Sequence, residues 1–170
     1  TRVHSGLESG DPVTLEQIRK GVEPDSAAAA FRHVMDAGIE LSVYLMVGVA
    51  GLERWREHAE GSAAVLNQAS PDFIRLRTFV PAVGPDWCER WKDGKLTLLD
   101  PYQALRETRH LVQNLEGPTF LLSDHISNFL DVHGRIPEDR GLMLETIAEA
   151  LGWPPEKFRP PTDTLVGMML

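Results

Sequence analysis

The stretch "IELSVYLMVGVAGLE" (residues 39–53) passes from a strand pattern through two glycines into the start of a helix. Its apolar residues alternate from Ile39 to Val47, and many side chains are β-branched or aromatic, which is typical of a β-strand. Helical periodicity begins at residue 52. A strand that leads directly into a helix indicates a strand–helix–strand unit, so this stretch predicts an α/β fold with parallel strands.

The same alternation continues on both sides of this stretch. Helix starts are marked by Asp-Pro at positions 11 and 100, and helix ends by Gly21, Gly38 and Gly152. The last eighteen residues are rich in proline, so we expect a domain over 1–152 and an extended C-terminal extension over 153–170. The patterns predict strands at 3–5, 39–47, 72–80 and 119–123. They predict helices at 12–20, 24–37, 52–68, 101–116 and 137–152, with a short helical piece at 87–91.

Four parallel strands with helices on one side would leave the other face of the sheet bare, whereas parallel sheets are normally covered on both faces. The sequence therefore predicts part of a larger TIM-like (β/α) barrel, with about four parallel strands and outer helices.

Composition narrows the class of protein. The chain has 170 residues, 42% of them apolar, which is enough for one packed domain. Its net charge of −8, with no block of Lys or Arg, gives no signal for nucleic acid or anionic membrane. No apolar run is long enough to span a membrane, and no signal peptide is visible. The single cysteine, Cys88, argues against a disulfide scaffold, so we expect a cytoplasmic protein.

Polar stretches follow each predicted strand: "GLESG" (6–10), "VGVAGLE" (47–53), "RTFVPAVG" (77–84) and "SDHISNF" (123–129). In parallel α/β folds the carboxyl ends of the strands form the ligand-binding edge, so these stretches are expected to meet at one mouth. Their side chains offer a carboxylate, hydroxyls, cations and an imidazole: Glu8, Ser5, Ser9, Ser42, Ser123, Lys20, Arg77 and His125.

Each candidate also has an ordinary structural interpretation, and the residues alone leave both open. Glu8 fits a loop carboxylate, and Lys20 fits a solvated side chain near a helix end. The cations at 75 and 77 share one strand face, where a structural ion pair is as good an explanation as a ligand contact. Asp124-His125 with Asn128 fits a helix cap as well as a catalytic cluster. No metal-ligand spacing and no nucleophile elbow is present.

Taken together and in order, "VHSGLESGDPVTLEQIRKGV", "AGIELSVYLMVGVAGLERWREHA", "PDFIRLRTFVPAVG" and "SDHISNFLDVHGRIPEDR" resemble the second half of a radical S-adenosylmethionine (radical SAM) enzyme. The similarity is to uncharacterised Fe–S oxidoreductases of the coproporphyrinogen-oxidase and elongator-like branch, and it covers about residues 1–151. It implies a partial (β/α) barrel whose first half carries a C-x-x-x-C-x-x-C loop and a 4Fe–4S cluster. That half is expected to be the missing partner of this chain.

The resemblance also implies roles for individual residues. Glu8, with Ser9 beside it, matches the residue that hydrogen-bonds the SAM ribose, and Lys20 matches the one that faces the methionine carboxylate. Ser42 and Tyr44 lie near a further ribose position, although relatives have an acid where Tyr44 stands. Gly48 and Gly51 match the glycine motif beside SAM, and Phe79 and Val80 match the backbone that meets adenine. Assigned by geometry alone, the expected substrate contacts are Arg77, Asp124, His125 and Asn128.

The implied parent enzyme cleaves SAM reductively at the cluster and uses a 5′-deoxyadenosyl radical on an unknown substrate. This chain alone is expected to be inactive and to bind no cluster, since three thiolates are needed and Cys88 is its only cysteine. Its open strand is expected to make it self-associate. The competing interpretation is a self-contained, non-catalytic α/β module that binds a nucleotide or a protein. An ordinary phosphate-binding barrel is disfavoured, because the glycine–phosphate loop signature is absent.

Overall fold

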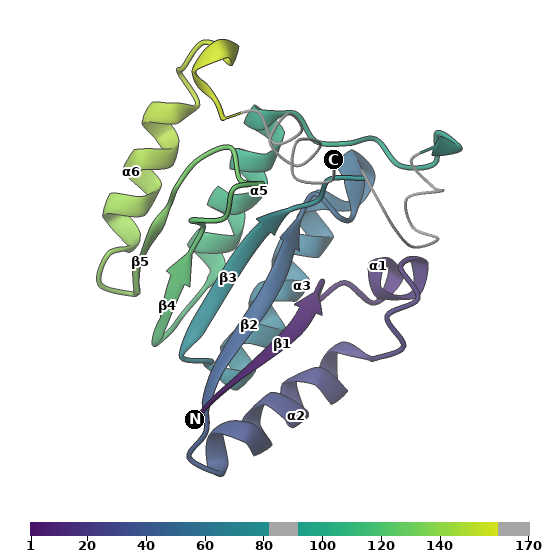
Figure 1. The fold of residues 1–170 in the computed structure, drawn as a ribbon, viewed down its shortest axis with the longest axis vertical. Coiled ribbons are helices and arrows are strands. Elements are labelled where there is room, and N and C mark those ends of the chain that lie inside the picture. The colour runs from purple at the N-terminus through teal and green to yellow at the C-terminus, as the bar shows by residue number, and fades with distance from the viewer. Residues whose placement is uncertain (82–91, 160–170) are drawn as a thin grey trace, which may run out of the picture.

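The computed structural model describes residues 1–81 and 92–159. Its five strands form one sheet in the order β1-β2-β3-β4-β5, the same as their order along the chain (Figure 1). The strands are β1 (Arg2–Glu8), β2 (Glu40–Val47), β3 (Phe73–Thr78), β4 (Thr119–Leu122) and β5 (His133–Ile136). The helices are α1 (Pro12–Gln17), α2 (Pro24–Asp36), α3 (Gly51–Ala69), α5 (Pro101–Asn114), α6 (Arg140–Ala150) and the 3₁₀ turn η1 (Pro155–Lys157).

The first four strands are parallel, as the alternating patterns predict. The prediction did not include the edge strand β5, which pairs antiparallel with β4 and places Arg135 opposite Phe120. The first strand is also longer than the predicted stub at 3–5. The short helical piece expected at 87–91, including Cys88, lies outside the described residues. The architecture is therefore an open, mostly parallel α/β sheet.

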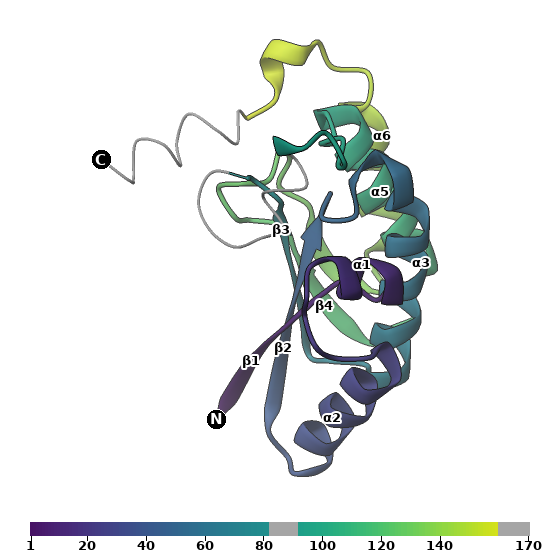
Figure 2. The same ribbon diagram turned by 90° about the vertical axis from the view of Figure 1, so that its right-hand side faces the viewer.

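All the labelled helices cover the same face of the sheet (Figure 2). Alternate strand residues point into this layer and are buried there, among them Leu41, Val43 and Leu45 of β2 and Ile74 and Leu76 of β3. This confirms the alternation predicted for 39–47 and 72–80. The core of the molecule lies between the sheet and its helices, as burial of one face of a parallel sheet requires.

The opposite side of the sheet, named here the open face, carries the other set of alternating side chains. Arginine guanidinium groups lie over three of its aromatic rings. Arg2 lies 4.2 Å from the centre of Phe73, Arg77 lies 4.6 Å from that of Tyr44, and Arg135 lies 5.7 Å from that of Phe120. Such cation–π contacts and the aliphatic stems of arginine cover apolar rings while the charge stays near water.

Two glycines let the loop after β1 lie directly on α3. A Cβ atom on Gly10 would be 2.3 Å from the backbone of Gly61, and one on Gly61 would be 2.6 Å from the Gly10 oxygen. The Gly10 N–H donates to Ser62 Oγ at 2.9 Å. Along α3 the buried positions include Ala59 and Leu66, whereas Leu52 near the start of the helix is 40% exposed.

Residues 153–159 pack against α5. The Tyr102 hydroxyl donates to the backbone oxygen of Trp153 at 2.6 Å, and the Tyr102 and Phe158 rings meet edge-on with centres 5.1 Å apart. Phe158 is buried. The predicted boundary between the domain and the C-terminal extension, at 152/153, stays a prediction. Residues 160–170 of that extension lie outside the described residues. Within the described ranges, no helix has the length and apolar character needed to cross a lipid bilayer.

Candidate functional site

Glu8 ends β1 in an unusual backbone conformation. Its φ is +63°, in the left-handed region that few residues other than glycine adopt, and the pairing of β1 with β2 shifts register between Gly6 and Glu8. The bulge turns the Glu8 side chain back over Gly6. A Cβ atom on Gly6 would lie 2.2 Å from Glu8 Oε1 and 3.2 Å from Lys20 Nζ, so a side chain at position 6 would displace the ends of both side chains from this arrangement.

Lys20 meets Glu8 because α1 ends early. The helix was expected to continue to residue 20, but it stops at Gln17, and Arg19 adopts a left-handed φ of +53°. The Lys20 N–H then bonds back to the Leu15 carbonyl at 2.9 Å. This turn places Lys20 Nζ 3.3 Å from Glu8 Oε1, with both side chains partly exposed. Glu8 and Lys20, which the resemblance assigns to the ribose and the methionine carboxylate of SAM, are thus brought together at the carboxyl end of β1.

The glycine stretch after β2 lies beside this pair along the same edge of the sheet. Gly48 and Gly51 have φ values of +80° and +68°. The Gly48 N–H donates to Glu107 Oε1 of α5 at 2.9 Å. Gly51 packs tightly against the segment before α5, because a Cβ atom there would lie 2.5 Å from Leu96.

A small apolar cluster, named here the mouth cluster, joins the ends of β2 and β3. Its buried members are Val49, Phe79 and Leu96, with Ile18, Met46 and Leu98 packed against them. The Phe79 N–H donates to the Val47 carbonyl at 2.8 Å, which continues the strand pairing past β3. Val80 is half-buried. Ile18 links this cluster to the turn that carries Lys20, so apolar and charged groups share one edge.

Ser9 lies away from the Glu8–Lys20 pair, in a buried polar chain behind the sheet. Its Oγ accepts the Asp11 N–H at 3.0 Å and lies 2.8 Å from Nδ1 of His58. His58 Nε2 in turn lies 3.4 Å from Oε1 of Glu107, and both residues are at most 2% exposed. Through Glu107 and Gly48, this chain connects the loop after β1 with the loop after β2.

The sequence reasoning missed His58 and Glu107. Burial lowers the pKa of His58 from 6.5 to about 4, with the charge of Asp11 opposing this. Burial also raises the pKa of Glu107 to about 8, although the Gly48 N–H opposes the shift. Both side chains are therefore neutral at pH 7. An ionisable residue at an inward position of an amphipathic helix was the only available signal for either.

Asp11 is the other buried carboxylate near the loop after β1. Its Oδ2 accepts the Thr14 N–H at 3.0 Å, which caps α1 as predicted, and Arg54 binds both oxygens at 2.8 and 2.9 Å. Burial alone would raise the pKa of Asp11, but the bonds from Arg54 and Thr14 outweigh it and lower the pKa to about 2. This ion pair fixes the loop after β1 to α3.

Ser42 and Tyr44 lie on the open face. The register places Tyr44 beside Gly6 of β1, and its ring meets the His4 ring with centres 5.9 Å apart. Ser42 is fully buried, and its Oγ makes no hydrogen bond within the described residues. Tyr44 is thus nearer to the Glu8 bulge than Ser42, whose neighbour on β1 is His4.

The loop after β4 fastens itself to the end of β3. Asn128 Nδ2 donates to the Leu76 carbonyl at 2.9 Å, and Asn128 Oδ1 accepts the Thr78 hydroxyl at 3.0 Å. Ser127 Oγ accepts the Thr78 N–H at 3.1 Å. These bonds satisfy backbone groups of β3 that β4 leaves unpaired, since the β3–β4 pairing stops at Arg75. The amide of Asn128 is therefore occupied within the fold.

Asp124 and His125 lie near the cations of β3. Arg75 Nη1 is 3.9 Å from Asp124 Oδ1, and Asp124 is exposed. Burial, and then the charge of Arg77, lower the pKa of His125, while Asp124 opposes the shift. Three of the four expected substrate contacts, Arg77, Asp124 and His125, are thus neighbours. Within the described residues, no group of three His, Cys, Asp or Glu side chains could hold a metal ion.

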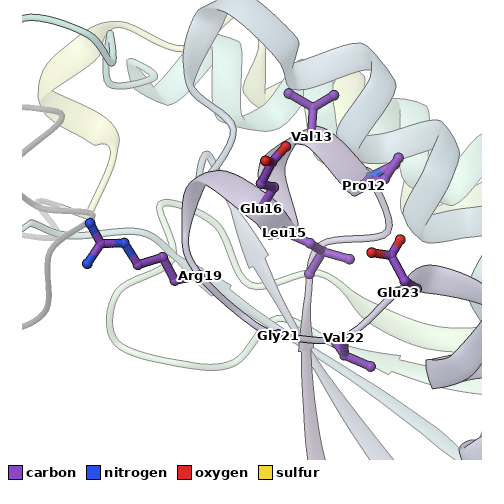
Figure 3. A pocket seen from close by; sticks show the side chains of 8 residues that line it. All are labelled: Pro12, Val13, Leu15, Glu16, Arg19, Gly21, Val22 and Glu23. Carbon is purple, nitrogen blue, oxygen red and sulfur yellow. The ribbon is translucent and has the colours of Figure 1, made fainter.

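A separate hollow of about 650 Å³ lies beside α1 and the turn that follows it (Figure 3). Its apolar lining includes Val13, Leu15 and Val22, and its carboxylates are Glu16 and Glu23. Neither Glu8 nor Lys20 lines it, so this hollow is distinct from the site at the strand ends.

No protein-family model matches the chain, and no curated protein matches it in sequence. A comparison of structures does find a match. The solved structure of archaeal Elp3 from Methanocaldococcus infernus, with an N-terminal deletion of residues 1–46, superposes on this chain with a TM-score of 0.63 at 19% sequence identity. The match covers 89% of this chain and 36% of the Elp3 chain, so the present chain spans about a third of that protein's length. The chain therefore has the fold of one part of the archaeal Elp3 structure.

Proposed function

We propose that this chain forms the C-terminal half of a radical SAM barrel and supplies the ribose and adenine side of the SAM site. The observation that carries the proposal is the Glu8–Lys20 pair, held over Gly6 at the carboxyl end of β1. Carboxyl ends of parallel strands are where ligands bind in such folds.

The chemistry of the pair suits the two ends of the SAM molecule. An ionised carboxylate accepts hydrogen bonds from two neighbouring ribose hydroxyls, and an ammonium group attracts the methionine carboxylate. In the structure Glu8 and Lys20 bond to each other at 3.3 Å, with both side chains partly open to solvent. Each group is therefore accessible, and each would exchange its present partner for the ligand.

Two further features support the proposal. The mouth cluster provides an apolar edge for a purine beside the backbone of Phe79. The fold is that of part of archaeal Elp3, which agrees with the resemblance of the sequence to the elongator-like branch of radical SAM enzymes. In a closed barrel the open face would form the interior, where Tyr44 and Arg77 would line the space beyond SAM.

Bound SAM would supply the reactive group, and this chain's residues would hold its adenosyl part and exclude water from it. The described residues do not fit the iron–sulfur cluster, because they contain no three-ligand group and the whole chain has one cysteine. The cluster ligands would come from another segment, which we propose as the principal partner of this chain.

Titration of the chain with SAM, followed by amide NMR, tests the proposal. We expect saturable shifts at Gly6, Lys20 and Gly48, and their loss in Glu8→Gln. The matched control Glu23→Gln removes an exposed carboxylate after α1 and should bind like wild type. Shifts that are confined to other parts of the chain, or that persist in Glu8→Gln, would overturn the assignment.

A second candidate is a self-contained α/β module that binds a nucleotide or a protein. The arginines stacked over Phe73, Tyr44 and Phe120 favour it, since they cover the open face without another segment. Light scattering separates the two candidates. A half-barrel is expected to associate through the unpaired edge of β1, whereas a strict monomer at high concentration would favour the module.

A further inference from the structure

The open face carries two cations side by side on β3. Arg75 and Arg77 are two residues apart on one strand, so their side chains leave the sheet on the same face. The register places Arg75 between Tyr44 of β2 and Leu122 of β4, and Arg77 next to Met46. The chain as a whole has a net charge of −8, so this concentration of positive charge is local.

The charge and the N–H groups of Arg75 have few partners in the fold. Its Nη1 is 3.9 Å from Asp124 Oδ1, at the limit of an ion pair, and the Asp124 side chain is 60% exposed. Its Nε is buried and makes no hydrogen bond within the described residues. A buried N–H of a cation without an acceptor costs free energy, which a bound acceptor would recover.

The charge of Arg77 is offset even less than that of Arg75 by the described residues. The guanidinium carbon of Arg77 lies over the Tyr44 ring, 4.6 Å from the ring centre, and this contact holds the guanidinium on the open face. Among the described residues, no carboxylate lies within ion-pair distance of it. Arginine presents its N–H groups in a rigid fork that matches the oxygens of carboxylate and phosphate groups.

His125 adds a third donor. Its Nδ1 accepts the Ser127 N–H at 3.2 Å and lies 2.8 Å from Ser127 Oγ, which itself accepts the Thr78 N–H. Because Nδ1 is an acceptor, the proton of the neutral ring is on Nε2. That N–H makes no hydrogen bond to any described residue.

We propose that Arg75, Arg77 and His125 form an oxyanion-binding subsite, which takes a carboxylate or phosphate group of the substrate. The proposal rests on the proposed function for its place, since the subsite lies on the open face beyond the Glu8–Lys20 pair. It goes further in naming the chemistry of the substrate: one with an anionic group, held by two guanidinium forks and an imidazole N–H. The Asp124 carboxylate then offsets part of the arginine charge when no anion is bound, and its negative charge weakens the binding of an anion.

The charged groups near His125 make its ring a direct reporter. They are Arg77 of β3, Asp124 beside it in the chain, and Arg159, whose Nη1 donates to the His125 carbonyl at 3.4 Å. An anion bound between Arg77 and His125 would offset the arginine charge, so the pKa of His125 would rise on binding.

The test is NMR titration of the histidine ring signals of the 170-residue chain with acetate and, separately, with methyl phosphate, at constant ionic strength in chloride. His125→Gln assigns the His125 signal, and His33, exposed on α2, serves as the remote control. We expect a saturable upward shift in the pKa of His125 only. A larger response to methyl phosphate assigns the subsite to phosphate, a larger response to acetate assigns it to carboxylate, and no response to either anion would overturn the proposal.

Variants separate a built subsite from general electrostatics. Arg75→Gln and Arg77→Gln should each weaken binding up to about fivefold, as expected for partly exposed charge pairs. Asp124→Asn should strengthen binding by a similar factor, a result that loss of structure cannot produce. Arg77→Lys tests the fork by keeping the charge, and Arg32→Gln on α2 is the matched control. Equal affinities for wild type, Arg77→Gln and Asp124→Asn would overturn the proposal, and the SAM titration would be unaffected by that result.

Discussion

Glu107 is predicted to make the stability of this fold decrease as the pH rises, the reverse of the usual behaviour of a carboxylate. Burial raises its pKa from 4.5 to about 8 and lowers the pKa of His58 from 6.5 to about 4. The folded protein therefore keeps both groups neutral between about pH 4 and pH 8. The unfolded chain instead ionises Glu107 above its ordinary pKa and protonates His58 below its own.

The magnitude follows from the protons that each state binds at this pair. Between pH 4.5 and pH 6.5 the folded and unfolded pairs both hold one proton, so their contribution to stability is constant. Between pH 6.5 and about 8 the folded pair still holds one and the unfolded pair holds none, so stability falls. At 1.36 kcal/mol for each pH unit, the loss over this interval is about 2 kcal/mol.

Glu107→Gln removes this proton from the balance while keeping an acceptor for the Gly48 N–H. Urea unfolding followed by tryptophan fluorescence at pH 6.5 and pH 8 measures the effect. The wild type should lose about 2 kcal/mol and Glu107→Gln should lose nothing. Glu145→Gln, which changes an exposed carboxylate on α6, should follow the wild type. If Glu107→Gln lost as much stability as the wild type, the buried neutral pair would be refuted.

Two further predictions concern how the loop after β1 is fixed to α3. Gly10→Ala, whose Cβ would lie 2.3 Å from the Gly61 backbone, should cost about 2–3 kcal/mol of unfolding free energy. Gly141→Ala, in α6 with nothing within 4 Å, should gain about 0.5–1 kcal/mol, and equal effects in urea would refute the close packing. Arg54→Ala strands the buried Asp11 carboxylate and should cost about 2–3 kcal/mol, allowing for the exposure of Arg54. Adding Asp11→Asn should recover most of that loss, whereas additive losses in the double variant would contradict the ion pair.

Most of the fold could be predicted because its signals are local. Alternation along 39–47 and the Asp-Pro helix start at 100–101 each depend on a few neighbouring residues, and the structure confirms the strand and the capped helix. The strand β5 was missed because its four residues include Gly134 and two polar side chains, and it exists only through its pairing with β4. The early end of α1 was missed for a similar reason, since it depends on Arg19 taking a left-handed conformation.

In the candidate site, too, individual residues could be identified from the sequence, whereas the contacts between them depend on the folded structure. The resemblance identified Glu8 and Lys20, but their ion pair depends on a bulge that no local pattern indicates. His58 and Glu107 lie far apart in the sequence and meet only when α3 and α5 pack together. Asn128 was expected at the substrate, and the structure shows its amide bonded to the end of β3, a requirement that arises only because β4 is short.

The central claim, that Glu8 holds the ribose of SAM, is tested most directly by calorimetric titration of SAM into the parent protein proposed above, in which a cluster-binding segment accompanies this chain. Glu8→Ala removes charge-assisted hydrogen bonds worth about 1.5–3 kcal/mol. Since each 1.4 kcal/mol is a factor of about ten in affinity, binding should weaken roughly ten- to a hundredfold. Glu23→Ala, which removes an exposed carboxylate near α1, should bind SAM like the wild type. Equal SAM affinities for the wild type and Glu8→Ala, at equal iron content, would contradict the claim.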